Sequence, residues 1–163
     1  MAAPIASAVH GEVQAGTTQV IVMGHSLGAG VGELLGTYLA RLLGSSATVS
    51  TRLFASPRVG NVPWSEYVDS TFPGGKFQYM VNYNDPVPHL PPKDLGFRHP
   101  SNELYITAVG SSDLLACSGS ENKKCSDQFA DPGNFITSLR DWATSDVHNG
   151  PYAGVMMGGG GCS

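Results

Sequence analysis

The chain is poor in charge and in long apolar runs, and these shortages exclude several classes of function. Only 13% of its 163 residues are charged, the net charge is −4, and no run of basic residues occurs. We therefore expect no binding to nucleic acid or to an anionic membrane surface. No apolar stretch approaches the roughly 20 residues of a membrane span, so no transmembrane segment is expected. Residues 1–14 lack a basic region and a long apolar core, which argues against a signal peptide in this chain.

Cysteine is also scarce, and its placement is informative. The three cysteines do not have the C-x-x-C spacing of a zinc site, and no other pattern indicates a metal or a cofactor. Cys117 and Cys125 bracket the polar stretch 118–124, which a disulfide could close. Cys162 is then left over. The alternative is that these residues are buried or incidental thiols, which behave as small apolar side chains.

The length and composition suit a single folded unit. With 41% hydrophobic residues, the chain can bury one core, so we expect one domain over residues 1–163. Strands alternate with helices along the sequence, as in an α/β fold. The apolar patterns predict an amphipathic helix in the N-terminal segment, strands over 20–23, 51–55, 76–82 and 103–109 (the last at the sheet edge), and helices over 28–43, 61–72 and 135–142.

The segment from Thr18 to Tyr38 is the most informative stretch. Its apolar run 20–23 is typical of a strand buried on both faces. Gly24-His25-Ser26-Leu27-Gly28 follows at once and fits the G-x-S-x-G turn, in which glycines allow a sharp reversal and the serine is strained and exposed. Ser26 is therefore the candidate nucleophile. The alternative is a serine in an ordinary turn between a strand and a helix.

A serine hydroxyl needs a base, and five histidines are available. His148 lies in a late loop, where chains with the order Ser…Asp…His carry the base. His99 is the fallback, although structural hydrogen bonds are the better interpretation for it. His25 is too close to the serine in sequence and is expected to pack. His10 and His89 are interpreted as helix-surface and loop residues.

The base in turn needs a carboxylate to fix its tautomer and stabilise its charged form. Asp85 lies where the strand 76–82 ends, in the proline-rich loop 83–92. Prolines restrict this backbone, and open α/β sheets place their sites at the carboxyl ends of strands. Asp146, close to His148, is the rival.

Four motifs together resemble one family. They are GHSLGA after VIVM, then FASPRVGN, NYNDPVPHLPP and DVHNGPYAG, and in this order they resemble the class 3 lipases of fungi, secreted α/β-hydrolases that act on acylglycerols. The resemblance implies a partial α/β-hydrolase sheet with flanking helices and a Ser26, Asp85, His148 triad without metal or cofactor. It also implies an ester substrate at a lipid–water interface and an extracellular location. In the family a cysteine near the C-terminus commonly pairs with one near the N-terminus. This chain has no cysteine ahead of Cys117, so Cys162 is expected to be free.

The resemblance covers only the later part of the family's domain. The backbone N–H of Leu27 is expected to be one oxyanion donor, whereas the second donor and the lid of the family come from elements ahead of the nucleophile strand. We therefore expect a truncated domain with an open sheet edge and self-association through that edge. Two alternatives stay open: a feruloyl-type esterase, and a catalytically impaired fragment produced by truncation or splicing.

Overall fold

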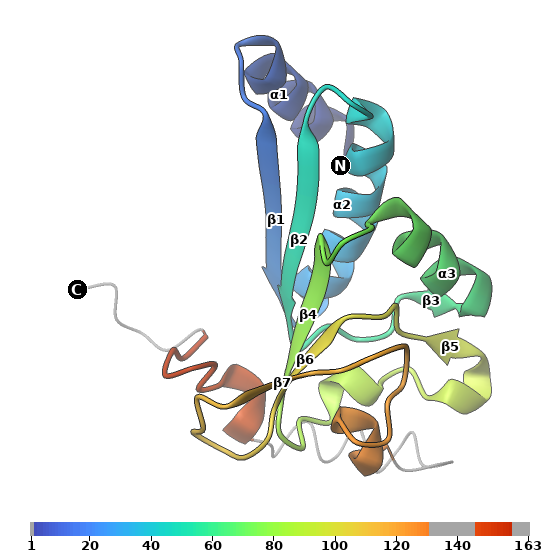
Figure 1. Ribbon diagram of the computed structural model, residues 1–163, viewed down its shortest axis with the longest axis vertical. Helices are drawn as coiled ribbons and strands as arrows, with labels where there is room; N and C mark the ends of the chain where they lie inside the picture. Colours follow the sequence, from blue (N-terminus) through green and yellow to red (C-terminus); the bar gives the residue numbers. More distant parts are fainter. Residues whose placement is uncertain (1, 131–145, 158–163) are drawn as a thin grey trace.

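The computed structural model describes residues 2–130 and 146–157. Within them, a five-stranded sheet has the order β1-β2-β4-β6-β7 (Figure 1). Adjacent strands among the first four pair in parallel, and β7 pairs antiparallel with β6. The strands are β1 Gln19–His25, β2 Thr48–Phe54, β4 Phe77–Asn82, β6 Glu103–Ile106 and β7 Leu114–Ala116. The short strands β3 Gly60–Asn61 and β5 Phe97–Arg98 form a separate antiparallel pair.

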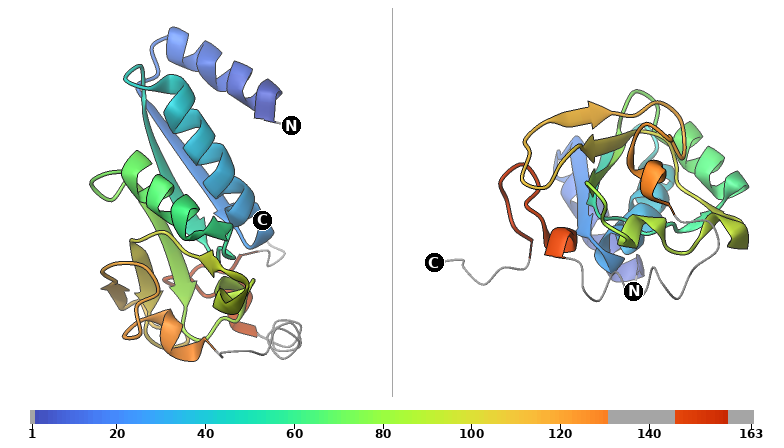
Figure 2. Two further views of the ribbon diagram at one scale, coloured as in Figure 1. Left: turned by 90° about the vertical axis from the view of Figure 1, so that its right-hand side faces the viewer. Right: turned by 90° about the horizontal axis from the view of Figure 1, so that it is seen from below.

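Helices cover one face of this sheet. The helices α2 Leu27–Leu43 and α3 Val62–Thr71 lie on the same side, and α1 Ala2–Gln14 packs beside α2 (Figure 2). Asn61 caps α3 as the sequence predicts, because its side-chain oxygen accepts a hydrogen bond from the Trp64 amide at 3.2 Å. In the described part of the chain, no helix is long and apolar enough to cross a membrane.

Helix α2 approaches the sheet through small residues. A Cβ added at Gly32 would lie 2.9 Å from Leu53, and one at Gly36 would lie 2.5 Å from Thr51. Glycine at these positions therefore lets the helix backbone come close to β2. The large apolar residues of α2 divide between its two sides: Leu39 and Leu43 are buried, whereas Val31, Leu34, Tyr38 and Leu42 are exposed. The apolar period predicts the helix correctly, but part of that period faces away from the core.

Strand β1 lies at the edge of the sheet. Within residues 2–130 and 146–157 it pairs with β2 on one side and with no strand on the other. The side chains of Ile21 and Met23 are 61% and 65% exposed, because they point to the sheet face opposite α2. The prediction that this strand is buried on both faces is therefore wrong for the described structure, while the predicted open edge is present.

Other differences from the sequence prediction concern element ends. Strand β2 starts at Thr48, three residues earlier than predicted, and β6 stops at Ile106. Strand β6 is not the edge, because β7 pairs with it from a segment for which no strand is predicted. A strand of three residues gives too short a pattern to recognise. The helix predicted over 135–142, and Cys162, lie outside the described residues.

Candidate active site

The turn after β1 is strained at its serine. Ser26 has φ 57° and ψ −130°, a backbone conformation that residues other than glycine rarely adopt. Its amide donates to the Phe54 carbonyl at 3.0 Å, and its carbonyl accepts from the Ala29 amide at 2.9 Å. These bonds tie the turn both to the end of β2 and to the start of α2. The predicted sharp turn between strand and helix is therefore present, with Ser26 at its apex.

The structure brings together the three residues that the sequence predicts for catalysis. Ser26 Oγ lies 2.8 Å from Nε2 of His148, and Nδ1 of His148 lies 3.0 Å and 3.2 Å from the two carboxylate oxygens of Asp85. Asp85 is fully buried and His148 nearly so. His148 belongs to the 3₁₀ turn Asp146–Asn149, at the lower ends of the strands in Figure 1. Each residue thus follows a different structural element and meets the others at one end of the sheet.

The carboxylate of Asp85 has a second donor that fixes its direction. Its Oδ1 atom accepts a hydrogen bond from the Val87 amide at 3.0 Å. The Asp85 amide donates to the Asn82 carbonyl at 3.0 Å, so the backbone turns sharply where β4 ends. Since both carboxylate oxygens then face the imidazole ring, Nδ1 of His148 carries the proton and Nε2 is left to accept one from Ser26.

The backbone that carries His148 is held by side chains from two strands and from its own loop. The His148 carbonyl accepts from Nε2 of His25 at 2.9 Å and from the Tyr152 hydroxyl at 3.0 Å. The Val147 carbonyl accepts from the Asn82 side-chain amide at 2.8 Å. The sequence predicts packing for His25, and its ring does lie against His148 at 4.8 Å between centroids. The hydrogen bond, and the contributions of Asn82 and Tyr152, have no signal in the sequence pattern.

His99, the alternative candidate for the base, is part of the packed interior. His99 is buried, its Nε2 atom lies 2.7 Å from the Pro88 carbonyl, and its ring stacks on Tyr79. Burial, and then the positive charge of Arg58, lower its pKa to about 4. His89, interpreted as a loop residue, lies in the short 3₁₀ helix Val87–His89 and is buried, and burial lowers its pKa to about 3. Both rings are neutral near pH 7 and take part in packing.

A buried arginine joins the Asp85 loop to the cysteine loop. Nε and Nη2 of Arg58 donate to the two carboxylate oxygens of Glu121 at 2.7 Å and 2.8 Å. Its Nη1 atom donates to the carbonyls of His89 and of Pro91, the latter at 3.0 Å. Burial would raise the pKa of Glu121, but the hydrogen bonds and the positive charge of Arg58, together with His99, outweigh it and hold this pKa below its ordinary value. Sequence reasoning missed Arg58 and Glu121, because nothing local marks them as partners.

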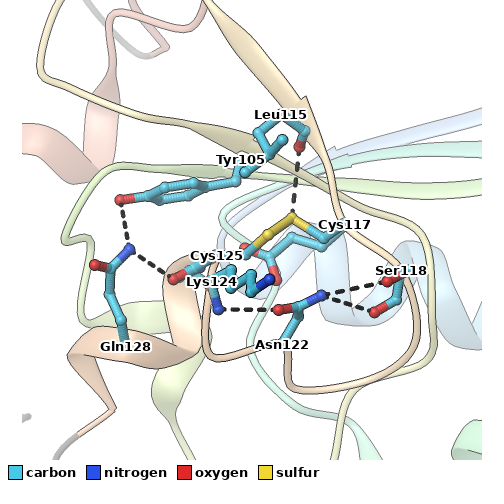
Figure 3. The surroundings of a disulfide bond; sticks show 10 residues. Tyr105, Leu115, Cys117, Ser118, Asn122, Lys124, Cys125 and Gln128 are labelled. Atoms are coloured by element: carbon cyan, nitrogen blue, oxygen red, sulfur yellow. Dashed lines mark hydrogen bonds between the residues drawn. A yellow bond between two sulfur atoms is a disulfide. The ribbon is translucent and has the colours of Figure 1, made fainter.

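The predicted disulfide is confirmed between Cys117 and Cys125 (Figure 3). The loop that it closes has its own hydrogen bonds: the Asn122 side chain donates to the Ser118 carbonyl at 2.9 Å and accepts from the Lys124 amide at 2.9 Å. This loop carries Glu121, so the disulfide supports the residue that binds the buried arginine.

Leu27 is placed where an oxyanion donor is expected. It is the first residue of α2, so its amide is one of those that lack an acceptor inside the helix. It directly follows Ser26, and its side chain is exposed. Among the described residues, no group of His, Cys, Asp and Glu could hold a metal ion.

Comparison with known proteins agrees with this geometry. Residues 5–95 match the family Lipase (class 3). The chain belongs to the class 3 lipase family. A secreted mono- and diacylglycerol lipase of Malassezia globosa is 37% identical to it over 87% of this chain and 43% of the relative. A lipase of Rhizopus niveus is 37% identical over 82% of this chain and 33% of the relative.

Solved lipase structures have a similar fold. The lipase of Rhizopus microsporus var. chinensis superposes with a TM-score of 0.73 at 31% identity, covering 93% of this chain and 50% of that one. A triacylglycerol lipase described as having a catalytic centre formed by a serine protease triad gives a TM-score of 0.72 at 26% identity, covering 94% and 54%. The chain thus has the α/β-hydrolase fold of these lipases. It spans half or less of the length of these relatives.

Proposed function

We propose that this protein is a serine carboxylic-ester hydrolase with Ser26 as nucleophile, His148 as base and acid, and Asp85 as the residue that orients His148. The observation that carries the proposal is the continuous chain of contacts, 2.8 Å from Ser26 to His148 and 3.0 Å from His148 to Asp85. The first distance suits proton transfer between Ser26 and His148, and the second suits a hydrogen bond that orients the His148 ring. Membership in a lipase family supports the same reaction.

In the proposed reaction, Nε2 of His148 removes the hydroxyl proton while Oγ of Ser26 attacks the ester carbonyl. Negative charge then develops on the carbonyl oxygen, and the Leu27 amide donates a hydrogen bond to it. The imidazolium gives its proton to the leaving alcohol, and the acyl group stays on Ser26. Water, deprotonated by His148, attacks this acyl ester; the bond to Oγ of Ser26 breaks, the imidazolium returns its proton to Oγ, and the carboxylic acid leaves. Throughout, Asp85 compensates the positive charge on His148.

Acylglycerols are the substrate class that we propose. Relatives over most of this chain are named mono- and diacylglycerol lipases. The side chains of Ile21, Met23 and Leu27 are exposed on β1 and at the elbow beside Ser26, and an apolar surface of this kind suits an ester held in a lipid aggregate. Because those relatives are named secreted, we propose an extracellular location.

The experiment is ester hydrolysis by the purified chain, measured with p-nitrophenyl butyrate and with an emulsified diacylglycerol. Ser26→Ala and His148→Ala are expected to reduce turnover to the background rate, because each removes one member of a unit that acts together. Ser46→Ala, an exposed serine in the turn after α2, is the matched control and should keep wild-type turnover. Equal turnover by Ser26→Ala and wild type would contradict the assignment.

We further infer that the edge of β1 that carries no partner strand among the described residues associates with a second copy of the chain. No residue of Gln19–His25 is acidic, lysine, arginine or proline, so two copies of this strand can pair without charge repulsion or a lost hydrogen-bond donor. Met23→Lys should weaken this pairing, because a lysine on an edge strand disfavours pairing with a further strand. Leu95→Lys, with the same 65% exposure as Met23, is the control. Sedimentation of wild type and Met23→Lys as identical monomers would overturn the inference.

A further inference from the structure

We propose that His25 and Asn82 are positioning residues that hold the His148 loop between the nucleophile and the carboxylate. This inference rests on the proposed function, since it concerns how the three side chains of the same triad are held in contact. His25 donates to the His148 carbonyl at 2.9 Å, and Asn82 donates to the Val147 carbonyl at 2.8 Å. Two successive peptide groups of the loop are thereby fixed by side chains of the sheet.

The location of the two donors gives them this role. His25 is the last residue of β1 and directly precedes Ser26, while Asn82 is the last residue of β4 and lies three positions before Asp85. Strands β1 and β4 both pair with β2, so the sheet fixes the distance between their ends. The base is therefore held by the same two strand ends that carry its partners. A displacement of about 1 Å at such a site can lower the rate about 100-fold.

The hydrogen bond that His25 donates fits a positioning role. Because Nε2 of His25 points at a carbonyl oxygen, it carries a proton and cannot accept one from Ser26. The same carbonyl also accepts from Tyr152 at 3.0 Å, so both of its lone pairs are used. A carbonyl with two donors is held more firmly than one with a single donor, which restrains the rotation of the His148 peptide group.

Asn82 retains an unfavourable feature alongside its useful bond. The residue is fully buried, and its side-chain oxygen has no hydrogen-bond partner in the described part of the chain. An unpaired buried polar atom costs roughly 1–3 kcal/mol, so an apolar side chain of similar size would suit the interior better. The amide hydrogen bond to Val147 is the contribution that an apolar side chain cannot supply.

Kinetics of side-chain replacements test the proposal. We expect His25→Leu and Asn82→Leu to lower kcat for p-nitrophenyl butyrate roughly 10- to 100-fold and to leave KM within about twofold, because the loss is in alignment and not in substrate binding. His25→Gln keeps a side-chain N–H donor and should recover part of the loss. His10→Leu replaces an exposed histidine of α1 and should behave as wild type.

A second measurement needs no turnover. In protein labelled with ¹⁵N-histidine, the Nδ1 proton of His148, shared with Asp85, is expected to give a sharp, exchange-protected resonance in wild type and in His10→Leu. In His25→Leu it should broaden and exchange faster. A folded His25→Leu protein with wild-type kcat and an unchanged His148 resonance would overturn the proposal. If wild type hydrolyses no ester but His25→Leu still alters the resonance, the proposed function fails and the positioning role stands.

Discussion

Gly24 and Gly28 flank the same serine but have different surroundings. A Cβ at Gly24 would lie 2.3 Å from the Gly28 carbonyl oxygen, whereas a Cβ at Gly28 would have no described atom within 4 Å apart from its chain neighbours and the adjacent backbone of its own helix. The two glycines of the G-x-S-x-G motif therefore have unequal roles in this structure. The first is required for the strand to pass beside the helix, and the second occupies an ordinary position in the first turn of α2.

This asymmetry predicts opposite effects of two alanine replacements. Gly24→Ala must push the strand away from α2 at the elbow, so we expect loss of several kcal/mol in unfolding free energy and at least a 100-fold loss of esterase activity. Gly28→Ala should keep its fold and gain up to about 1 kcal/mol, because alanine favours helix. Thermal melting and p-nitrophenyl butyrate hydrolysis test both. A Gly24→Ala protein that melts at the wild-type temperature would refute the steric argument.

Asp85→Asn tests the proposed orienting role of the Asp85 carboxylate, because asparagine has nearly the same volume as aspartate. The side-chain amide of asparagine has the same shape but presents N–H groups, and one of these must face either the Val87 amide or Nδ1 of His148. We expect His148 to change tautomer and kcat to fall roughly 10⁴-fold, as for the corresponding change in a serine protease triad. Asp113→Asn, an exposed aspartate, is the control. A loss of less than tenfold would rule out an orienting carboxylate at this position.

The sequence is sufficient for the local part of the fold and for the order of the site residues. The glycine-flanked Ser26 after an apolar strand predicts its own turn, because strand, turn and helix lie within one short segment. Asp85 is recognisable because prolines hold it at the end of β4. His148 is recognisable by its position in the chain order. The first two predictions depend on neighbouring residues and the third on chain order, and the structure brings the three side chains within hydrogen-bonding distance.

What the sequence does not reveal depends on contacts between distant segments. Arg58 and Glu121 are 63 residues apart, and neither lies in a pattern that marks a buried charge. The two histidine-loop supports, His25 and Asn82, act through single hydrogen bonds that periodicity cannot indicate. Likewise, the apolar period of α2 contains Val31 and Leu34 on an exposed side, because small residues form the side that meets β2.

Arg58→Met is expected to cost about 3–5 kcal/mol of unfolding free energy. The replacement removes the two guanidinium donors of Glu121, whose side chain is only 11% exposed, and leaves it the His99 amide at 3.0 Å and Lys93 Nζ at 4.0 Å. A buried charge that loses its main partner is strongly unfavourable. Replacing both partners, as Arg58→Met with Glu121→Leu, should recover part of the loss. Arg41→Met, on the exposed side of α2, is the matched control. Urea unfolding measures all of these, and equal stability of Arg58→Met and Arg41→Met would contradict the prediction.

Removing the Cys117–Cys125 disulfide should lower stability by about 2–3 kcal/mol. The bond closes a loop with a sequence separation of 8 residues, and the loop-entropy relation gives about this value. The double replacement Cys117→Ser, Cys125→Ser should melt like reduced wild type and show no response to dithiothreitol. Peptide mapping without reduction should yield the linked 117–125 peptide. Recovery of either cysteine linked to Cys162 would refute this pairing.

The last prediction concerns the buried carboxyl group of Glu33 and the pH dependence of stability. Glu33 of α2 is fully buried, and one of its oxygens accepts from Nε1 of Trp64 at 2.6 Å. The other has no partner among the described residues. Burial raises the pKa of Glu33 from 4.5 to about 7, the Trp64 hydrogen bond opposes this rise, and the negative charge of Asp69 adds to it. Because the pKa of Glu33 differs between the folded and the unfolded chain, its titration should appear in the pH dependence of the unfolding free energy.

The sign follows from comparing folded and unfolded chains. Below about pH 4.5 both hold the proton on Glu33 and no difference arises. Between pH 4.5 and about 7 the unfolded chain releases it while the folded chain retains it, so unfolding free energy falls as pH rises, and the loss is constant above that range. The total is on the order of 3 kcal/mol.

Glu33→Gln mimics the protonated form, so we expect wild-type stability at pH 4.5 and greater stability than wild type at pH 8. Because His89 and His99 titrate in the opposite sense in both proteins, the difference between the two urea-unfolding curves isolates Glu33. A difference that does not change between pH 4.5 and pH 8 would show that Glu33 keeps an ordinary pKa in the folded chain.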